Sequence, residues 1–349
     1  MKRTLRLTAA ALAVSLSLVG CSMDSDEEPS SNGTSNSGDS AGSGSGEATG
    51  PVEDLSVGFV AVNLNSPSIN GIKDQFVEAA EEKGWSVEVF DGQGDQAATN
   101  NAASDFISRG VDVIVNNSSP NAQMTGVMKE ADAAGIPFVS IYGGFVEGVD
   151  AEIGTNEFIN STLMTAEMAN RLEGKGRVVK LNWTVLQALR DRDAGFKAVM
   201  SENPGIEVVR EIEVKVPGQV DDTYAQLTNL LQSDKEIDAI WLGWDELAPP
   251  AVRAITEAGL EDKVFAVGFD GNSFAWDLIR EGSPYKMEPA NPFPLMGSKA
   301  VETIETIVGG GTLPSKVVYM KPCLVNEQTV PAEGEEPDWE NCAFFPGDI

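Results

Sequence analysis

The stretch Trp241–Gly271, WLGWDELAPPAVRAITEAGLEDKVFAVGFDG, decides the fold class. An apolar run, Ile237–Leu242, reaches into the start of this stretch. The polar residues Trp244–Glu246 follow that run. Small and apolar residues then recur at helical spacing up to Gly259, and a second apolar run covers Val264–Val267. This order predicts a strand, a helix and a strand. Short buried strands that a helix connects are typical of a parallel sheet covered on both faces.

Both strands of this stretch end in an aromatic residue next to an aspartate, Trp244–Asp245 and Phe269–Asp270. In parallel α/β sheets, ligands bind beyond the carboxyl ends of the strands. An aromatic face can cover the C–H groups of a sugar or polyol, and a carboxylate accepts hydrogen bonds from its hydroxyls. The repeated pattern indicates such a ligand. For each residue alone an alternative stays open: Asp245 can cap the following helix, and Phe269 can be ordinary core.

The same alternation fills the rest of the chain in two rounds. Expected strands lie at 55–62, 85–90, 111–115, 136–141 and 151–154, then at 177–181, 206–214, 237–242 and 264–267, with a last strand at 317–320 and a helix at 297–308 before it. Two rounds of similar length predict two α/β lobes side by side. The polar strand tips of both lobes are expected to face a shared cleft.

The composition excludes several classes of function. The chain has 349 residues with 24 basic and 54 acidic side chains, a formal charge of −30 and no histidine. A surface this acidic repels phosphate backbones, so no nucleic-acid partner is expected. The lack of histidine excludes Ser–His–Asp and Cys–His catalysis and histidine metal sites.

No cofactor or metal is expected from the motifs. Residues Gly92–Ala97 fit a loose dinucleotide pattern, but they follow the second expected strand and are interpreted as a turn with a helix start at Asp95. The carboxylates of Asp245, Glu246 and Asp270 are the candidates for a glycosidase pair, but hydroxyl binding or helix capping explains them better. The sequence therefore does not favour the hypothesis that the protein is an enzyme.

The amino terminus has the features of an exported lipoprotein. Lys2, Arg3 and Arg6 precede an apolar segment that is too short to span a bilayer and that ends at Leu18-Val19-Gly20-Cys21, which resembles a bacterial lipobox. We expect residues 1–20 to be a signal peptide and Cys21 to carry the lipid. Residues 21–52, rich in Ser, Gly and Asp, are expected to form a flexible tether. The protein would then be exported and lipid-anchored to the outer face of the cytoplasmic membrane, or periplasmic.

Two further cysteines, Cys323 and Cys342, lie near the carboxyl end. An even pair in an exported chain indicates one disulfide. The bond would close a loop that has little core of its own.

From about Leu55 to Met320 the chain resembles the type I periplasmic sugar-binding proteins, the ribose- and galactose-binding family of ABC importers. The segments that carry this resemblance are VGFVAVNLNSPSINGIKDQFVEAAEEKG, SRGVDVIVNNSSP, AAGIPFVSIYGG, EIGTN, RDRDAGF, WDELAPPAVRAITEAG and VFAVGFDGNS, in that order. The resemblance implies two Rossmann-like lobes with parallel sheets, the Venus-flytrap arrangement, joined by three crossovers. It also implies no catalysis.

The resemblance implies a set of ligand-binding positions as well. They are Ser66, Tyr142, Asn156, Arg192, Trp244, Asp245, Phe269, Asp270 and Asn291, to which Trp183 is added as a further aromatic in the cleft of the second lobe. Several depart from the family pattern: Tyr142 and Gly143 stand where an Asp–Arg pair is usual, and Ser68 and Ile69 replace a stacking aromatic pair. These departures favour a modified sugar, a deoxy sugar, a polyol or a flat heterocycle over an ordinary pyranose or ribose. Trp183 either contacts the ligand or packs at the hinge.

The expected lobes are residues 53–155 plus about 285–312, and residues 156–284 plus about 313–349. The expected function is that of a monomeric solute-binding lipoprotein that delivers a small sugar-like or polyol ligand to an ABC transporter permease. The alternative is a sensor of the same fold that signals to a membrane receptor.

Overall fold

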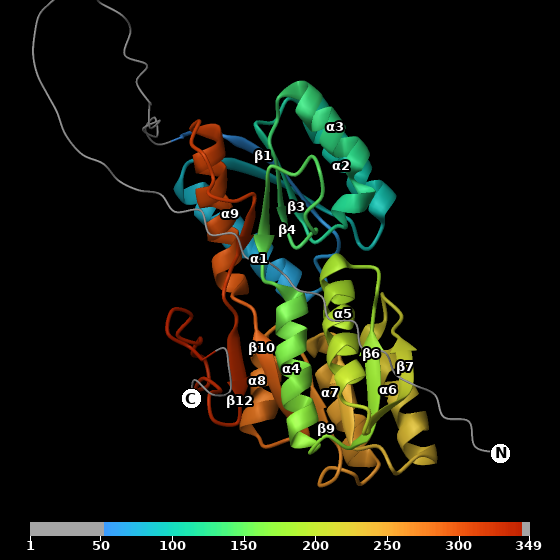
Figure 1. The fold of residues 1–349 in the computed structure, drawn as a ribbon. Helices are drawn as coiled ribbons and strands as arrows, with labels where there is room; N and C mark the ends of the chain where they lie inside the picture. Colours follow the sequence, from blue (N-terminus) through green and yellow to red (C-terminus); the bar gives the residue numbers. More distant parts are fainter. Residues whose placement is uncertain (1–51, 344–349) are drawn as a thin grey trace, which may run out of the picture. The chain divides into compact units, whose positions relative to one another are not determined.

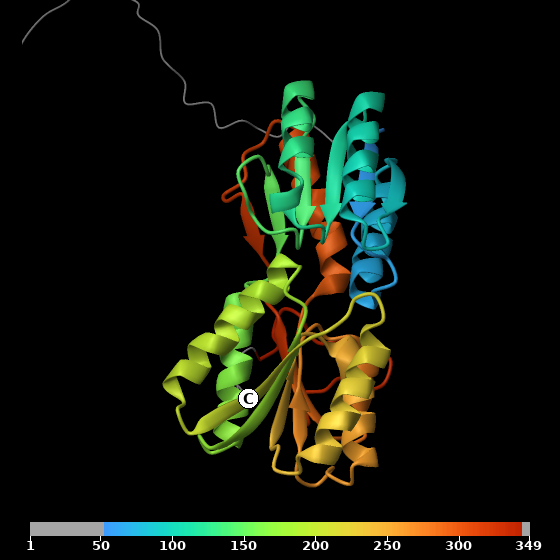
Figure 2. The ribbon, with the colours of Figure 1, turned by 90° about the vertical axis from the view of Figure 1, so that its right-hand side faces the viewer.

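The computed structural model describes residues 52–343. The expected signal peptide, the expected lipidation site Cys21 and almost all of the expected tether lie outside the described residues. The described chain forms two lobes, each with a six-stranded sheet that helices flank on both faces (Figures 1 and 2). This arrangement confirms the predicted α/β class with two Rossmann-like lobes. No helix within residues 52–343 has both the length and the apolar character that a membrane crossing requires.

The first lobe contains a fully parallel sheet in the order β11-β5-β4-β3-β1-β2. Its strands are β1 (Ser56–Ala61), β2 (Ser86–Asp91), β3 (Val113–Asn117), β4 (Phe138–Ile141), β5 (Ala151–Gly154) and β11 (Val317–Tyr319). Its helices are α1 (Pro67–Glu82), α2 (Gln96–Arg109), the short η1 (Asn121–Gln123), α3 (Thr125–Ala134) and α9 (Phe293–Val308). The central strands β1 and β3 are buried because both of their faces are covered.

The second lobe has the strand order β12-β10-β9-β8-β6-β7, in which only β12 runs antiparallel. Its strands are β6 (Gly176–Asn182), β7 (Ile206–Glu213), β8 (Ala239–Leu242), β9 (Phe265–Val267), β10 (Tyr285–Ala290) and β12 (Cys323–Asn326). Its helices are α4 (Glu157–Arg171), α5 (Gln187–Glu202), α6 (Gln219–Ser233), η2 (Asp245–Leu247), α7 (Ala248–Glu257) and α8 (Ser273–Arg280). The stretch Trp241–Gly271 thus contains the end of β8, followed by η2, α7 and β9.

Two strands of the second sheet, β10 and β12, were not predicted from the sequence. β10 reads YKMEPA, and its lysine, glutamate and proline hide the apolar pattern that predicts a buried strand. Glu288 is nevertheless buried there, because its carboxylate accepts a hydrogen bond of 2.7 Å from the Tyr285 hydroxyl. β12 follows the segment that was expected to be the last strand.

The pairing of β10 and β11 also differs from the expected lobe boundaries. β10 pairs with β9 and β12, so residues 285–290 belong to the second sheet and not to the first lobe. β11 pairs with β5, so residues 317–319 belong to the first sheet and not to the second lobe. The reason is that hydrogen bonding to a distant strand decides membership of a sheet, and short sequence patterns do not encode that pairing.

The chain passes between the lobes at three places: from β5 to α4, from β10 to α9, and from β11 to β12. Thr155 and Asn156 lie in the first connection, and Asn291 lies in the second. α9 packs on α1, which places the helix after the second connection in the first lobe (Figure 2). The connections therefore carry polar residues to the border of the two lobes.

Two local predictions are confirmed. The Asp95 carboxylate accepts a hydrogen bond of 3.0 Å from the Ala98 amide, and it caps the start of α2. A disulfide joins Cys323, at the start of β12, to Cys342, with 5.5 Å between the two Cα atoms. The bond attaches the terminal segment to a strand of the second sheet.

Candidate ligand-binding cleft

A cavity of about 170 Å³ lies where the strand tips of the two lobes meet. The residues that line it come from both lobes: Val62, Asn63, Ser66, Ser68, Ile69, Ile72, Gln93, Gly94, Ser118, Tyr142 and Phe293, and then Trp183, Leu186, Ala188, Leu189, Arg192, Val216, Pro217, Gln219, Trp244, Glu246 and Asp270. Its walls are mainly apolar and aromatic, and a few polar groups converge on it. Cavities of this composition are the usual sites of small ligands.

The structure brings most of the predicted positions to this cavity. Six of them line it: Ser66, Tyr142, Trp183, Arg192, Trp244 and Asp270. Three lie directly behind it and are buried: Asp245, Phe269 and Asn291. Asn156 lies elsewhere, because its side chain accepts a hydrogen bond of 3.1 Å from the Ile159 amide and caps α4.

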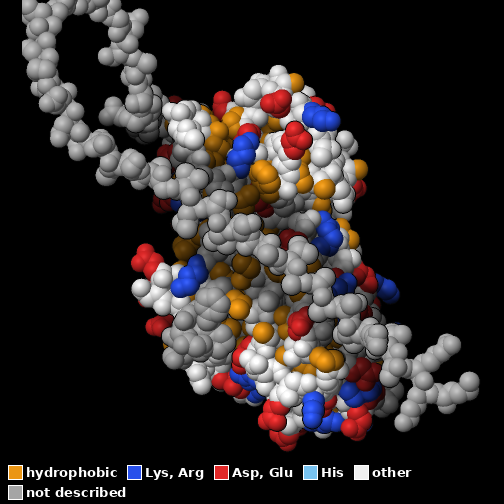
Figure 3. Space-filling model, in the orientation of Figure 1, with side chains coloured by type: hydrophobic (Ala, Val, Ile, Leu, Met, Phe, Trp, Pro, Cys, Tyr) orange, Lys and Arg blue, Asp and Glu red, His pale blue; other side chains and the backbone are white. Residues whose placement is uncertain are grey.

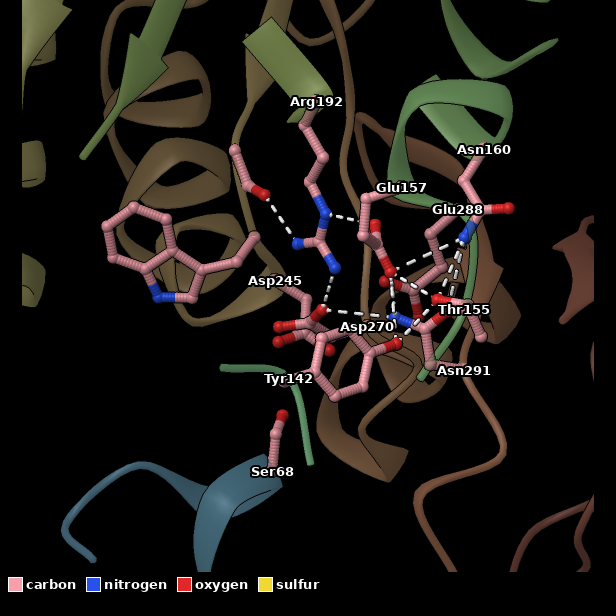
Figure 4. Close-up of polar contacts among 12 residues, drawn as sticks. Ser68, Tyr142, Thr155, Glu157, Asn160, Arg192, Asp245, Asp270, Glu288 and Asn291 are labelled. Atoms are coloured by element: carbon pink, nitrogen blue, oxygen red, sulfur yellow. Dashed lines mark hydrogen bonds and ion pairs between the residues drawn. The ribbon is translucent and has the colours of Figure 1, made fainter. Parts of the chain in front are cut away.

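Arg192 is the central cation of the cleft (Figure 4). It projects from α5 and is only 2% exposed. Its Nε lies 2.5 Å from Glu157 Oε2, its Nη2 lies 2.6 Å from Asp270 Oδ1, and its Nη1 donates to the Gly243 carbonyl at 2.8 Å. The guanidinium also lies over the Phe269 ring, 4.8 Å from the ring centroid. Phe269 therefore packs against the guanidinium of Arg192 and is not among the residues that line the cavity.

Glu157 is the second centre of this network, and it is not among the positions predicted from the sequence. It is the first residue of α4 and is 3% exposed. Its Oε1 accepts hydrogen bonds from the Tyr142 hydroxyl at 3.0 Å and from Asn291 Nδ2 at 3.2 Å, and it also contacts the Thr155 hydroxyl. Burial opposes its ionisation, but Arg192 and these hydrogen bonds outweigh burial, so the pKa of Glu157 lies below its ordinary value.

The Glu157 network joins the two lobes. Tyr142 follows β4 of the first lobe, Thr155 and Asn291 lie in the connections, and Glu157 and Arg192 belong to the second lobe. The neighbouring position, Gly143, has no room for a side chain in this structure. A Cβ atom at Gly143 would lie 2.4 Å from Ser140 Oγ and 2.7 Å from the Asn116 and Asn121 side chains. The Tyr142–Glu157 hydrogen bond therefore ties the first lobe to the start of α4.

Asp270 has an unusual backbone. Its φ angle is 106°, in a region that side-chain-bearing residues rarely adopt. The amide of Asp270 donates to the Pro289 carbonyl at 3.2 Å, and its own carbonyl accepts from the Asn291 amide at 2.7 Å. These bonds hold the residue in this conformation and aim its carboxylate at Arg192. Strained backbone is frequent at binding sites.

Asp245 does not cap the helix that follows it, so this alternative is wrong. Its Oδ2 accepts a hydrogen bond of 2.7 Å from the amide of Asn272, the residue before α8, and the Asn272 side chain donates to both of its oxygens. The Asn272 Nδ2 also donates to Ser68 Oγ of the first lobe at 2.9 Å. Asp245 thus orients Asn272, whose side chain bonds to both lobes.

Carboxyl groups outnumber cations in the buried half of the cleft. Burial and the nearby Asp270 raise the pKa of Asp245 well above its ordinary value, and burial and Asp245 do the same for Glu288. Burial also raises the pKa of Asp270, although Arg192 opposes this. Within residues 52–343 no group of acidic or cysteine side chains has the arrangement of a metal site.

A second cavity of about 300 Å³ lies beside the first connection between the lobes. Asn156, Glu157, Tyr142 and Glu152 are among the residues that line it. Burial raises the pKa of Glu152 to about 7, although the Ser140 hydroxyl, the Asn121 amide and two backbone amides partly offset this.

Comparison with known proteins agrees with this architecture. A family model described as "Periplasmic binding protein domain" matches residues 57–312. The ribose import binding protein of Bacillus subtilis is 26% identical over 266 residues, which cover 75% of this chain and 84% of that protein. The galactofuranose-binding protein of Escherichia coli is 24% identical over 295 residues, which cover 81% of this chain and 91% of that protein.

Solved structures have the same fold. An ABC transporter solute binding protein from Bacillus halodurans with bound myo-inositol has a TM-score of 0.73 and 24% identity, and the match covers 81% of this chain and 98% of that one. A solute binding protein from Agrobacterium vitis with bound allitol has a TM-score of 0.74 and 21% identity, with 80% and 97% covered. Because the family model spans most of the chain and the two-lobed topology agrees with it, this protein belongs to the periplasmic binding protein domain family.

Proposed function

We propose that this protein captures a small sugar or polyol in the cavity between its lobes and delivers it to the permease of an ABC transporter. The observation that carries the proposal is the Arg192–Asp270 pair at the base of the cavity, buried and hydrogen-bonded on the protein side. Such a pair can donate to and accept from ligand hydroxyls without reorganising. Two of the relatives are a ribose import binding protein and a galactofuranose-binding protein, which supports the same ligand class.

Each part of the cavity has a role in this proposal. Asp270 accepts hydroxyl hydrogen bonds, and charge-assisted bonds of this kind contribute about 1.5–3 kcal/mol each. Trp183, Trp244 and Tyr142 cover the C–H faces of the ligand and exclude water. Ser66, at the start of α1, adds a hydroxyl from the first lobe. A ligand that contacts both lobes favours their closed arrangement, which is the form that a permease would recognise. No catalytic step is required.

We also infer that export and a lipid on Cys21 hold the protein at the membrane surface, where it would act as a monomer. The lipobox-like segment and the polar residues that follow it support this inference. Metabolic labelling with a fatty-acid analogue tests it: a Cys21→Ser variant should lose the label and be released from the membrane fraction.

A thermal-shift screen tests the binding function. The panel contains pentoses, hexoses, deoxy sugars, polyols, nucleosides and small heterocycles. A ligand at 100 times its Kd adds about 2.7 kcal/mol to the free energy of unfolding, which raises Tm visibly. A hit among sugars or polyols is the expected result.

The site is then tested with Asp270→Asn, which keeps the shape and tolerates a positive φ. This variant should bind the hit at least tenfold more weakly. Asp277→Asn is the matched control, because Asp277 is an exposed residue of α8 that pairs with Arg280. Equal affinity of Asp270→Asn and the wild type would refute the site, and a hit confined to heterocycles would refute the sugar class.

A further inference from the structure

The balance of charge in the cavity bears on which sugars or polyols it accepts. Among the described residues that line the cavity, Arg192 is the only cation. Its guanidinium already contacts Glu157, Asp270 and the Gly243 carbonyl. A carboxylate or phosphate on a ligand would therefore have to compete with two protein carboxylates for the same guanidinium. An anionic ligand does not fit this cavity.

Two carboxylates line the same cavity, Asp270 and Glu246. Arg192 lies against one oxygen of Asp270, whereas Glu246 has no cationic partner within residues 52–343. The neighbours of Glu246 are neutral: the indole N–H of Trp244 donates to Oε2 at 3.0 Å, and Gln219 Nε2 lies 3.5 Å from Oε1. Glu246 is thus an acidic group that the protein positions but does not neutralise.

Further carboxyl groups are buried directly behind the cavity. Behind the cavity lie Glu157, Asp245 and Glu288, all at most 3% exposed. Together with Asp270 and Glu246 they make five carboxyl groups around one guanidinium. Burial and the charge of Asp270 raise the pKa of Glu246, although its bond to Trp244 opposes this. A positive charge placed between Glu246 and Asp270 would stabilise both carboxylates.

We propose that the ligand carries a basic amino group, as an amino sugar or amino polyol, and that its ammonium group lies against Glu246 beside Asp270. The inference rests on the proposed function, since it names the ligand class of the same cavity. The hydroxyls bind Asp270 and Arg192, and the ring lies against Trp183 and Trp244, whose faces also attract cations. Glu246 is then the residue that selects amines.

Calorimetric titration with matched sugars at pH 7 tests this proposal. The probes are D-glucose, D-glucosamine and N-acetyl-D-glucosamine, the corresponding galactose series, and myo-inositol with its 1-amino-1-deoxy derivative. In at least one series the amine should bind at least tenfold more tightly than the neutral parent. Where an acetylated member exists, it should lose this advantage because acetylation removes the charge.

Variants then assign the preference to one residue. Glu246→Gln should weaken binding of the amine at least tenfold more than it weakens binding of the neutral parent. Glu261→Gln, an exposed acid on the same lobe, is the control and should change neither. If the neutral parents bind as tightly as the amines, or if Glu246→Gln keeps the ratio, the amine inference is wrong while the proposed function stands. If no sugar, polyol or amine binds, both fail.

Discussion

Arg192 shows how a single residue organises the cleft. Its three kinds of donor each have a different partner, which leaves the guanidinium one fixed orientation. The fork geometry of arginine makes this possible, and a lysine would offer only a point charge. The residue therefore combines a structural role with a role in the proposed site.

We predict that Arg192→Met destabilises the protein strongly. Glu157 and Asp270 would remain buried without their cation, and breaking a buried ion pair typically costs about 3–5 kcal/mol. Urea unfolding measures the loss. Arg253→Met is the control, because Arg253 pairs with Glu257 at the surface and should contribute less than about 1 kcal/mol. A loss below about 1 kcal/mol for Arg192→Met would show that the carboxylates find other partners.

The raised pKa of Glu152 predicts that the stability of the protein depends on pH. Its pKa rises from 4.5 to about 7 on folding, so between these values the folded state binds more protons than the unfolded state. The contribution of Glu152 to stability is therefore fully present below about pH 4.5 and is lost as the pH rises to 7, by about 3 kcal/mol.

The test compares Glu152→Gln with the wild type by urea unfolding at pH 5 and pH 8. Between pH 5 and pH 8, the stability of Glu152→Gln relative to the wild type should rise by about 2.5 kcal/mol, since glutamine does not ionise. Glu130→Gln, an exposed change on α3, should follow the wild type. Parallel pH profiles for Glu152→Gln and the wild type would contradict a raised pKa.

At the scale of elements, the crossing of α9 over α1 depends on one glycine. A Cβ atom at Gly297 would lie 2.3 Å from the Phe76 amide nitrogen and 2.7 Å from the Ile72 carbonyl oxygen. Both contacts are with backbone, so a side chain would have to move a whole helix. The helices can approach this closely only because position 297 has no side chain.

We predict that Gly297→Ala destabilises the protein by about 1–3 kcal/mol, the usual cost of overpacking a well-filled core. Gly71→Ala is a matched control within α1, because nothing lies within 4 Å of a Cβ at Gly71. That change should stabilise the protein by about 0.4–1 kcal/mol through the unfolded chain. Thermal unfolding of both variants measures the difference, and a neutral Gly297→Ala would mean that α9 shifts freely.

The net charge of −30 is a property of the whole molecule. With 54 acidic and 24 basic residues, the acidic side chains exceed the basic ones by 30. Acidic and basic side chains are interspersed on the surface shown in Figure 3. Exposed ion pairs such as Arg253–Glu257 do form. Exposed pairs contribute about 0–1 kcal/mol each, and self-repulsion of the excess acid outweighs them.

We therefore expect added salt to stabilise the protein. Raising NaCl from 0.01 M to 0.15 M shortens the screening length from about 30 Å to about 8 Å and should increase Tm by a few degrees. Choline chloride at the same concentration should have the same effect, because screening depends on ionic strength. A Tm that falls with salt would show that the surface ion pairs dominate.

The sequence by itself determined the α/β class, the two rounds of strand and helix, the disulfide partners and most of the residues that reach the cavity. It did so because these features depend on local signals: apolar periodicity, glycine stops, cysteine count, and polar residues directly after strands. Parallel strands bring their tips to one edge, so Trp244 and Asp270 meet although they lie far apart in the chain.

Only the tertiary structure decided which carboxylates act together. Glu157 looks like an ordinary first-turn acid in the sequence, and Glu288 interrupts a strand. Folding nevertheless places Glu157 against Arg192 and Glu288 near Asp245 and Asp270. Asn156 shows the reverse, since its motif resembles a binding segment but its side chain is used to cap α4. Burial and hydrogen-bond partners are properties of the packed lobes, and no local pattern encodes them.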